Sequence, residues 1–589
     1  MAFQLSPGVN VSEVDLTTIV PSAATTTGAL AAYMPWGPAQ KIITVTSETD
    51  VVNYFAPQGP DNNTAIGFFT ASSFLAYGNN LQFVRSVGAN SKNAQANTYN
   101  APIQVPNKDV FQANNYLSFG NGNYNGPFMS RFPGALGNSI QVDTYDSSSS
   151  AAWATATLTS GGATYNWSSL FNSYPTTSVY TAAAGGANDE FHIVVTDAAG
   201  LFTGTRGTIL ETFAFVSKAS DASINGSSNY WKQVLFNNSQ YVFGVDAVDY
   251  YNTNTTWNKP AANISFARTS TADITSLMSG GIDDVGSDSN LQNSYSLFAN
   301  RQTVDISLVL TAGADTTLQQ YIIDNVVNTR ADCVGFISPP QTAVVNQSGQ
   351  EVTNINTWLN ALSRSSTYVV ADSGWKYMYD RYNQTYRWIP LNGDIAGLCA
   401  YTDTIKDPWY SPAGFNRGNI KNAIKLAWNP SKTYRDTLYA AGVNPVVSFP
   451  GNGIVLYGDK TLQSKPSAFD RINVRRLFIT LEKAITKAAQ YSLFEFNDDF
   501  TRAQFVALVA PFLRDIQGRR GITDFRVVCD TTNNTSQVIN SNQFVGDIYI
   551  KPARSINFIQ LNFVAVGTGV DFSTVVGGSS SNSIPLGIV

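Results

Sequence analysis

The sequence is short of charged residues and of cysteine. Asp, Glu, Lys and Arg make up 13% of the 589 residues, whereas aromatic residues reach 12%. A free monomer with so few charges would expose much apolar surface, so we expect a subunit that buries surface in an assembly. The three cysteines, Cys333, Cys399 and Cys529, are widely spaced and odd in number. This spacing argues against a disulfide framework and for a reducing compartment.

Histidine is also scarce, which bears on enzyme activity. The single histidine, His192, lies in an alternating apolar segment that predicts a strand, and no candidate nucleophile stands beside it. Zinc would need a cluster of Cys and His, which the sequence lacks. We therefore expect His192 to be structural, and we predict no enzyme activity, no catalytic residue, no metal and no cofactor.

Residues 453–461 come closest to a nucleotide-binding loop. Such a loop needs Gly, four further residues, and then Gly-Lys-Ser/Thr at the start of a helix. In this chain Asp459 separates Gly458 from Lys460 and brings a negative charge to the position of the phosphate. The middle of the segment has the composition of a strand, so we do not expect ATP binding.

Long apolar runs are absent as well. The sequence has no stretch of about 20 apolar residues, the length that spans a bilayer. The N-terminal residues lack the basic start and apolar run of a secretory signal. The formal net charge is −5, and no strong basic patch offsets it. We therefore expect neither membrane insertion nor a nucleic-acid partner.

Two parts of the chain, residues 21–92 and 301–450, alternate strand and helix patterns. Such alternation predicts a mostly parallel sheet with right-handed crossovers, so we predict that they form one α/β body. Residues 93–300 are rich in Ser, Thr, Asn, Gly and aromatics, and residues 147–188 contain no charged residue. The aromatics argue against disorder. We predict a mixed α/β multidomain protein in which residues 93–300 form one or two β-rich insertion domains.

A predicted pair of helices dominates the C-terminal part. At roughly 100° per residue, the first helix, residues 472–490, places on one face an apolar stripe of Leu477, Leu481, Ala484, Ile485 and Ala488. Arg476, Lys483 and Lys487 form a basic stripe on another face. Residues 470–526 contain ten Lys and Arg against seven Asp and Glu. This cationic ridge is either a solvated helix face or a surface that docks onto an acidic partner.

The second helix of the pair is predicted to begin at Thr501, which forms a capping-box pattern with Gln504. Gly518 is its predicted stop. Its buried stripe is expected to consist of Phe505, Leu508, Phe512 and Ile516.

Both ends of the chain carry short strand patterns. Val9 and Val11 alternate with polar residues in an N-terminal arm, residues 1–20, which also contains Val14. Ile559, Leu561 and Phe563 alternate in residues 556–566, ahead of a Gly/Ser-rich tail. One short strand cannot bury enough surface to be stable alone, so each must pair with another strand. The partner is either the same chain or a neighbouring subunit.

Motifs along most of the chain resemble those of a known family. They are Ser6-Pro7-Gly8-Val9 with Glu13, Gly37-Pro38, residues 78–85, residues 131–140, and the run from Asn444-Pro445 to Val474-Arg475-Arg476-Leu477. In this order they resemble the contractile tail sheath proteins of bacteriophages, most closely the T-even-like members. The most recognisable part is residues 444–477.

The resemblance implies a structural subunit that polymerises as a helical sheath around a tail tube, in stacked hexameric rings. Contraction of such a sheath drives the tube through the host envelope. The family also implies baseplate and tail terminator or neck proteins as partners. The expected location is the tail of the virion, after assembly in the cytoplasm of a bacterial host.

For particular residues, the resemblance implies two kinds of contact. Residues 451–570 resemble the tube-facing C-terminal domain, whose basic helix here carries Arg475, Arg476, Lys483 and Lys487 as tube-contact candidates. Terminal strands of neighbouring subunits join the sheet of that domain in the family, which implies arms at residues 1–20 and 571–589. The candidate inter-subunit residues are Val9, Val11, Val14, Ile559, Leu561 and Phe563. The β-rich insertion would face outward.

A non-contractile virion protein is the alternative. A capsid protein, or an adhesin whose β-rich insertion binds a receptor, would share the low charge and the lack of catalytic residues. It would not need a cationic helix. Electron micrographs separate the two hypotheses, because a sheath forms tubules with a central channel and the alternatives form shells or isolated spikes.

Overall fold

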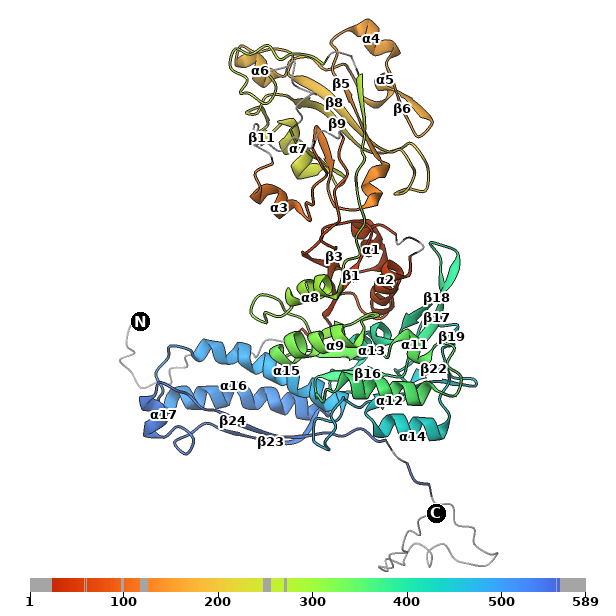
Figure 1. Cartoon of the computed structure of the whole chain (residues 1–589). Coiled ribbons are helices and arrows are strands. Elements are labelled where there is room, and N and C mark those ends of the chain that lie inside the picture. Colours follow the sequence, from red (N-terminus) through yellow and green to blue (C-terminus); the bar gives the residue numbers. More distant parts are fainter. Residues whose placement is uncertain are drawn as a thin grey trace, which may run out of the picture. The chain divides into compact units, whose positions relative to one another are not determined.

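The computed structural model describes residues 24–57, 59, 61–96, 100–116, 126–246, 256–269, 273–557 and 559–561. The chain divides after Ala553 into a large unit and a C-terminal unit of residues 554–589. The large unit contains many helices and several sheets (Figure 1), which confirms the predicted mixed α/β class. The predicted arms at residues 1–20 and 571–589 lie outside the described residues, as do Val9, Val11, Val14 and Phe563.

A seven-stranded sheet forms the centre of the large unit. Its spatial order is β2 (Ile42–Val45), β3 (Leu81–Ser86), β1 (Gly28–Tyr33), β14 (Leu308–Leu310), β15 (Val334–Ile337), β16 (Val369–Asp372) and β20 (Val443–Asn444). β2 runs antiparallel to β3, and every other pairing in the sheet is parallel. The predicted mostly parallel sheet is therefore present. Gly28 lies opposite Leu308, so strands from the two distant parts of the chain meet at its centre.

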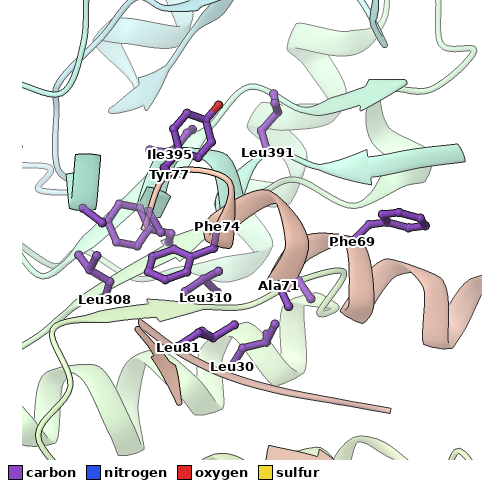
Figure 2. Packing of buried hydrophobic residues seen from close by; sticks show 14 of the residues in the cluster. Leu30, Phe69, Ala71, Phe74, Tyr77, Leu81, Leu308, Leu310, Leu391 and Ile395 are labelled. Carbon is purple, nitrogen blue, oxygen red and sulfur yellow. The ribbon is translucent and has the colours of Figure 1, made fainter. Parts of the chain in front are cut away.

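Apolar side chains cover both faces of this sheet, because alternate residues of a strand point to opposite sides. On one face Leu30 and Leu308 pack with Phe74 of α2 (Asn62–Leu75) and Ile395 of α13 (Asn392–Ile405), as Figure 2 shows. On the other face Ala29 and Val309 pack with residues of α9 (Thr316–Ile322) and α12 (Glu351–Leu362). The parallel sheet is thus sandwiched between helices, as such sheets usually are.

Shorter elements complete the body. The strands are β17 (Trp375–Asp380), β18 (Thr385–Pro390) and β19 (Lys425–Leu426), which form one sheet, and the hairpin β21 (Val446–Phe449) and β22 (Gly453–Leu456). The helices are α1 (Glu48–Phe55), α8 (Asp288–Ser296), α10 (Asn328–Arg330), α11 (Gln341–Val344) and α14 (Lys432–Ala440), with a π-helical turn at Ile323–Val327.

The segment between β3 and β14 contains an antiparallel four-stranded sheet of its own. Its order is β13 (Asp273–Leu277), β5 (Ile140–Tyr145), β8 (Glu190–Asp197) and β9 (Thr208–Ser217). Smaller pairs are β4 (Phe128–Ser130) with β12 (Val242–Gly244), β6 (Thr157–Ser160) with β7 (Ala163–Asn166), and β10 (Ser223–Ile224) with β11 (Ser227–Ser228). The helices of this segment are α3 (Lys108–Ala113), α4 (Ser150–Thr155), α5 (Trp167–Leu170), α6 (Val179–Ala183) and α7 (Trp231–Asn238), with a 3-10 turn at Ala135–Ser139.

Arg85, in β3, ties this β-rich segment to the body. Its buried guanidinium donates hydrogen bonds to the carbonyl oxygens of Met34 (2.7 Å), Gly37 (2.8 Å) and Pro133 (2.7 Å). Burial lowers the pKa of Arg85 to about 9. Because these carbonyls belong to both parts of the chain, one side chain holds the two parts together.

The C-terminal part of the large unit is a helical hairpin on a two-stranded sheet. α15 (Ile472–Ala489) and α16 (Asp499–Gly518) lie side by side along β23 (Ile522–Val528) and β24 (Asp547–Pro552), with α17 (Ser536–Asn540) between the strands in sequence (Figure 1). The predicted capping box at Thr501 is wrong. Asp498 is the N-cap, because its carboxylate accepts a hydrogen bond of 2.8 Å from the backbone N–H of Thr501.

Candidate interaction site

The apolar stripe predicted on α15 is confirmed. Its five members, Leu477, Leu481, Ala484, Ile485 and Ala488, are buried. The stripe predicted on α16 is only half correct. Phe505 and Ile516 are buried, but Leu508 and Phe512 are only half-buried, and Val509 and Leu513 fill the core in their place. The hairpin therefore has a core of its own, which holds α15 and α16 together.

Arg476 faces the interior of the protein. Its guanidinium pairs with the carboxylate of Asp403, at the end of α13, with a closest approach of 2.5 Å, and each side chain is 4% exposed. It also donates a hydrogen bond to the carbonyl of Cys399 at 3.3 Å. Arg476 thus fastens α15 to the α/β body.

Arg475 is buried as well, but against aromatic rings. Its guanidinium carbon lies 4.2 Å from the ring centre of Tyr368 and 4.0 Å from that of Phe469. It donates a hydrogen bond of 3.1 Å to the hydroxyl of Tyr368. Burial lowers the pKa of Arg475 from its usual value. Arg475 therefore makes its cation–π contacts within the subunit.

The two lysines of the predicted ridge lie near Asp305, which precedes β14. Lys483 is 8% exposed and donates hydrogen bonds to Asp305 (2.9 Å), to the carbonyl of Ile306 (2.7 Å) and to Ser307 (3.0 Å). Lys487 is 48% exposed and lies 3.7 Å from Asp305. Of the four predicted tube-contact residues, Lys487 is therefore the one with a largely accessible side chain.

The expected exposed cationic ridge is therefore wrong as a description of the subunit. The helical spacing does place Arg476, Lys483 and Lys487 along one side of α15, but that side packs against the body, where Asp403 and Asp305 neutralise it. Whether these residues meet a tube stays a prediction.

The turn between α15 and α16, together with the first two residues of α16, exposes apolar side chains that the sequence patterns did not single out. We call residues 491–500 the aromatic turn; its members Tyr491, Leu493, Phe494, Phe496 and Phe500 are between 63 and 105% exposed. The turn has no helical or strand periodicity, so a periodicity search misses it. The density of aromatics in ten residues is the signal that could have found it.

The sheet beneath the hairpin consists of β23 and β24 alone among the described residues. Each strand therefore has one paired side, and two strands by themselves make a marginal sheet. Beyond β24, in the C-terminal unit, Ile556, Ile559 and Leu561 are exposed, and the described residues of the predicted strand 556–566 form no strand.

His192 has the structural surroundings expected of it. Its ring stacks on Phe171 with centres 4.2 Å apart, Nδ1 accepts a hydrogen bond from the backbone N–H of Phe215 at 3.0 Å, and Nε2 lies 2.9 Å from the carbonyl of Ser173. Burial lowers the pKa of His192 to about 4. The imidazole is thus held neutral, with both nitrogens in hydrogen bonds.

Asp372 and the three cysteines are buried as well. Asp372, at the carboxyl end of β16, accepts hydrogen bonds from Ser338 (2.6 Å) and from the N–H of Gly374 (2.8 Å) and is fully buried. The three cysteines are unpaired and buried. Within the described ranges, no group of three His, Cys, Asp or Glu is placed to hold a metal ion. No helix in the same part of the chain is long and apolar enough to cross a membrane.

Two protein-family profiles match the chain: "Phage tail sheath protein central domain" over residues 295–462 and "Phage tail sheath C-terminal domain" over residues 464–565. The tail sheath protein of Vibrio phage KVP40 is 35% identical, over 97% of this chain and 100% of that protein. The tail sheath protein of Enterobacteria phage T4 is 33% identical, over 97% and 99%. Among solved structures, a sheath tail protein from Listeria innocua shares the fold, with a TM-score of 0.53, 11% identity, and coverage of 92% of this chain and 94% of that one.

Proposed function

This chain belongs to the tail sheath proteins of bacteriophages and is a subunit of a contractile tail sheath, and we propose that it polymerises around a tail tube by exchanging terminal segments between copies. Its curated relatives are structural proteins of the phage tail, which supports a structural and not a catalytic role. The finer assignments below are proposals about how the subunit assembles.

The two-stranded sheet of β23 and β24 carries the proposal of strand exchange. Each strand has one side without a strand partner among the described residues. A strand from a neighbouring copy would satisfy those backbone groups, with its alternate side chains setting the register. The donor is a chain end and the acceptor is a sheet edge. Because these surfaces differ, the contact is heterologous and repeats as a helix instead of closing into a dimer.

The proposed donors are the two chain ends. The N-terminal candidates are Val9, Val11 and Val14, and the C-terminal ones are Ile559, Leu561 and Phe563. Ile559 and Leu561 lie two residues apart and so share one side of an extended segment. Both are exposed in the subunit, 78 and 71% respectively, which leaves them available to a neighbour.

Contact with the tube is proposed through the C-terminal helical hairpin. Lys487 has the exposed charge that such a contact needs, whereas Arg475, Arg476 and Lys483 would act by holding α15 in place. We further propose stacked hexameric rings, contacts with baseplate and terminator proteins at the two ends, and assembly in the host cytoplasm. Contraction would then release energy stored at assembly, without a nucleotide.

Deletion of each chain end tests the proposal. One variant lacks residues 1–15 and another lacks residues 554–589, and each is expressed together with the tail tube protein. Both should fold, because the paired strands β23 and β24 remain, yet neither should form sheaths in negative-stain electron micrographs. The control is Val179→Ser, at an exposed site in α6 of the β-rich segment. Sheaths of normal length from either deletion would remove that end from the exchange.

A further inference from the structure

The aromatic turn is an unusual surface for a folded protein. Five apolar side chains, Tyr491, Leu493, Phe494, Phe496 and Phe500, lie within ten residues, and each is mostly exposed. Single exposed apolar residues are common, but five within one short segment mark a site that another surface covers. Aromatic side chains are also those that contribute most to binding at protein interfaces.

Hydrogen bonds anchor the C-terminal end of the turn. The guanidinium of Arg502 donates to the carbonyl of Asn497 (3.2 Å) and to its side-chain oxygen (2.6 Å), and pairs with Asp499 at 2.5 Å. The Asn497 amide donates to the carbonyl of Gln543 at 2.7 Å, which connects the turn to the segment before β24. A surface fixed in advance loses little conformational entropy on binding.

Phe494 shows that this conformation has a cost. Its φ is 69°, in the left-handed region that a bulky residue rarely adopts, and its side chain is fully exposed. A strained backbone that presents an aromatic ring to solvent gains nothing within the subunit. Such strain is typical of residues whose conformation serves a contact.

We propose that the aromatic turn receives the C-terminal segment of a second copy of this chain, through Ile559 and Leu561, with the positive charge of Arg554 ahead of them. This inference rests on the proposed exchange of chain ends and adds, to the sheet edge that accepts a strand, a second surface that anchors one of those ends. The segment exposes its three apolar side chains by 82, 78 and 71%. Ile559 and Leu561 share one side of an extended strand, so both can contact the same turn.

Charge favours this partner over a second turn. Residues 491–502 contain three carboxylates, Glu495, Asp498 and Asp499, against the one guanidinium of Arg502. Two such turns face to face would oppose like charges. Arg554, which is exposed at the start of the C-terminal segment, brings the opposite charge to Glu495. Complementary charges across an interface select the partner and set its orientation.

Disulfide trapping between two differently tagged chains tests the contact. One chain carries Phe496→Cys and the other Ile559→Cys, and the two are expressed together with the tail tube protein. The native cysteines are buried and unpaired, so they will not compete. Assembled sheaths should give a mixed disulfide dimer on a non-reducing gel. Replacing Phe496→Cys by Val179→Cys, an equally exposed site in α6, should give none.

Three results would overturn the inference: a dimer of Phe496→Cys chains alone, which means turn against turn; a cross-link to the tube protein; or intact sheaths without any cross-link. If Phe496→Cys blocks assembly, exchanging the charges of Glu495 and Arg554 tests the contact instead. Glu495→Arg and Arg554→Glu should each reduce the yield of sheaths by roughly tenfold, and together they should restore it. If each single variant reduces the yield of sheaths and the double variant does not restore it, the contact is contradicted.

The proposed exchange of the C-terminal segment has a test separate from that of the aromatic turn. If deletion of residues 554–589 leaves sheaths unchanged, the C-terminal exchange itself is wrong. If that deletion stops assembly but trapping and charge exchange both give the overturning result, the exchange stands and the aromatic turn is not its receptor.

Discussion

The guanidinium of Arg476 and the carboxylate of Asp403 form a buried ion pair, 2.5 Å apart at the closest, between α15 and α13. Both residues are almost inaccessible to solvent. Because of this pair, Arg476 has a structural role and is not a basic residue exposed for docking. Assembly defects caused by changing Arg476 would therefore report first on the fold of the hairpin, and only then on any contact with the tube.

Arg476→Leu should destabilise the subunit strongly. The change leaves the Asp403 carboxylate buried without its partner, which typically costs about 3–5 kcal/mol. Urea unfolding of the subunit, followed by circular dichroism, measures the loss. The matched control is the double variant Arg476→Leu with Asp403→Leu, which removes both charges and should recover most of the stability. A single variant as stable as the native chain would contradict the structural role.

Lys487→Glu should leave the fold intact and reduce docking onto tubes. Lys487 is 48% exposed and its pair with Asp305 is accessible to water, so losing the pair should cost less than about 1 kcal/mol. Thermal unfolding checks the fold, and electron microscopy of tubes with co-expressed subunits checks docking. Lys465→Glu, an exposed charge reversal ahead of α15, is the control. Equal sheath coverage of tubes for both variants would remove Lys487 from the tube contact.

Asp372→Asn should change how stability depends on pH. Burial, with a smaller contribution from nearby Asp394, raises the pKa of Asp372 to about 8. The folded state therefore keeps this proton while the unfolded state loses it near pH 4, so the stability contributed by the group is complete below about pH 4 and is lost as pH rises towards about 8. Asparagine resembles the protonated carboxyl and has no proton to lose.

The melting temperature of Asp372→Asn, measured at several pH values, checks this expectation. The variant should match the native chain near about pH 4 and exceed it increasingly towards about pH 8. The native chain, measured in parallel at the same pH values, is the reference. A difference between Asp372→Asn and the native chain that is independent of pH would contradict the raised pKa.

His192 should stay neutral in the folded protein at every pH near neutrality. Burial lowers its pKa to about 4, and Nδ1 already accepts a hydrogen bond from Phe215. Stability contributed by this group is present above the unfolded pKa of about 6.5 and is lost as pH falls towards about 4. Because the chain has one histidine, isotope-labelled histidine gives one set of NMR signals. Those signals should not titrate between about pH 5 and about pH 8, unlike free histidine in the same buffer.

Local patterns predicted much of the fold correctly. The parallel sheet followed from alternating strand and helix segments in residues 21–92 and 301–450. The apolar stripe of α15 followed from helical spacing, which depends only on the geometry of the helix. The cap of α16 was misplaced because Asp498 and Thr501 are both good caps, and only the path of the chain into the helix decides between them.

The sequence by itself determined the α/β class, the periodic faces of α15, and the scarcity of the residues that catalysis and metal binding require. It could not determine which way the basic stripe faces. Arg476 meets Asp403 across 73 residues and Lys483 meets Asp305 across 178, and no local pattern contains such pairs. The exposure of the aromatic turn was decided in the same way, because packing of distant segments leaves those rings uncovered.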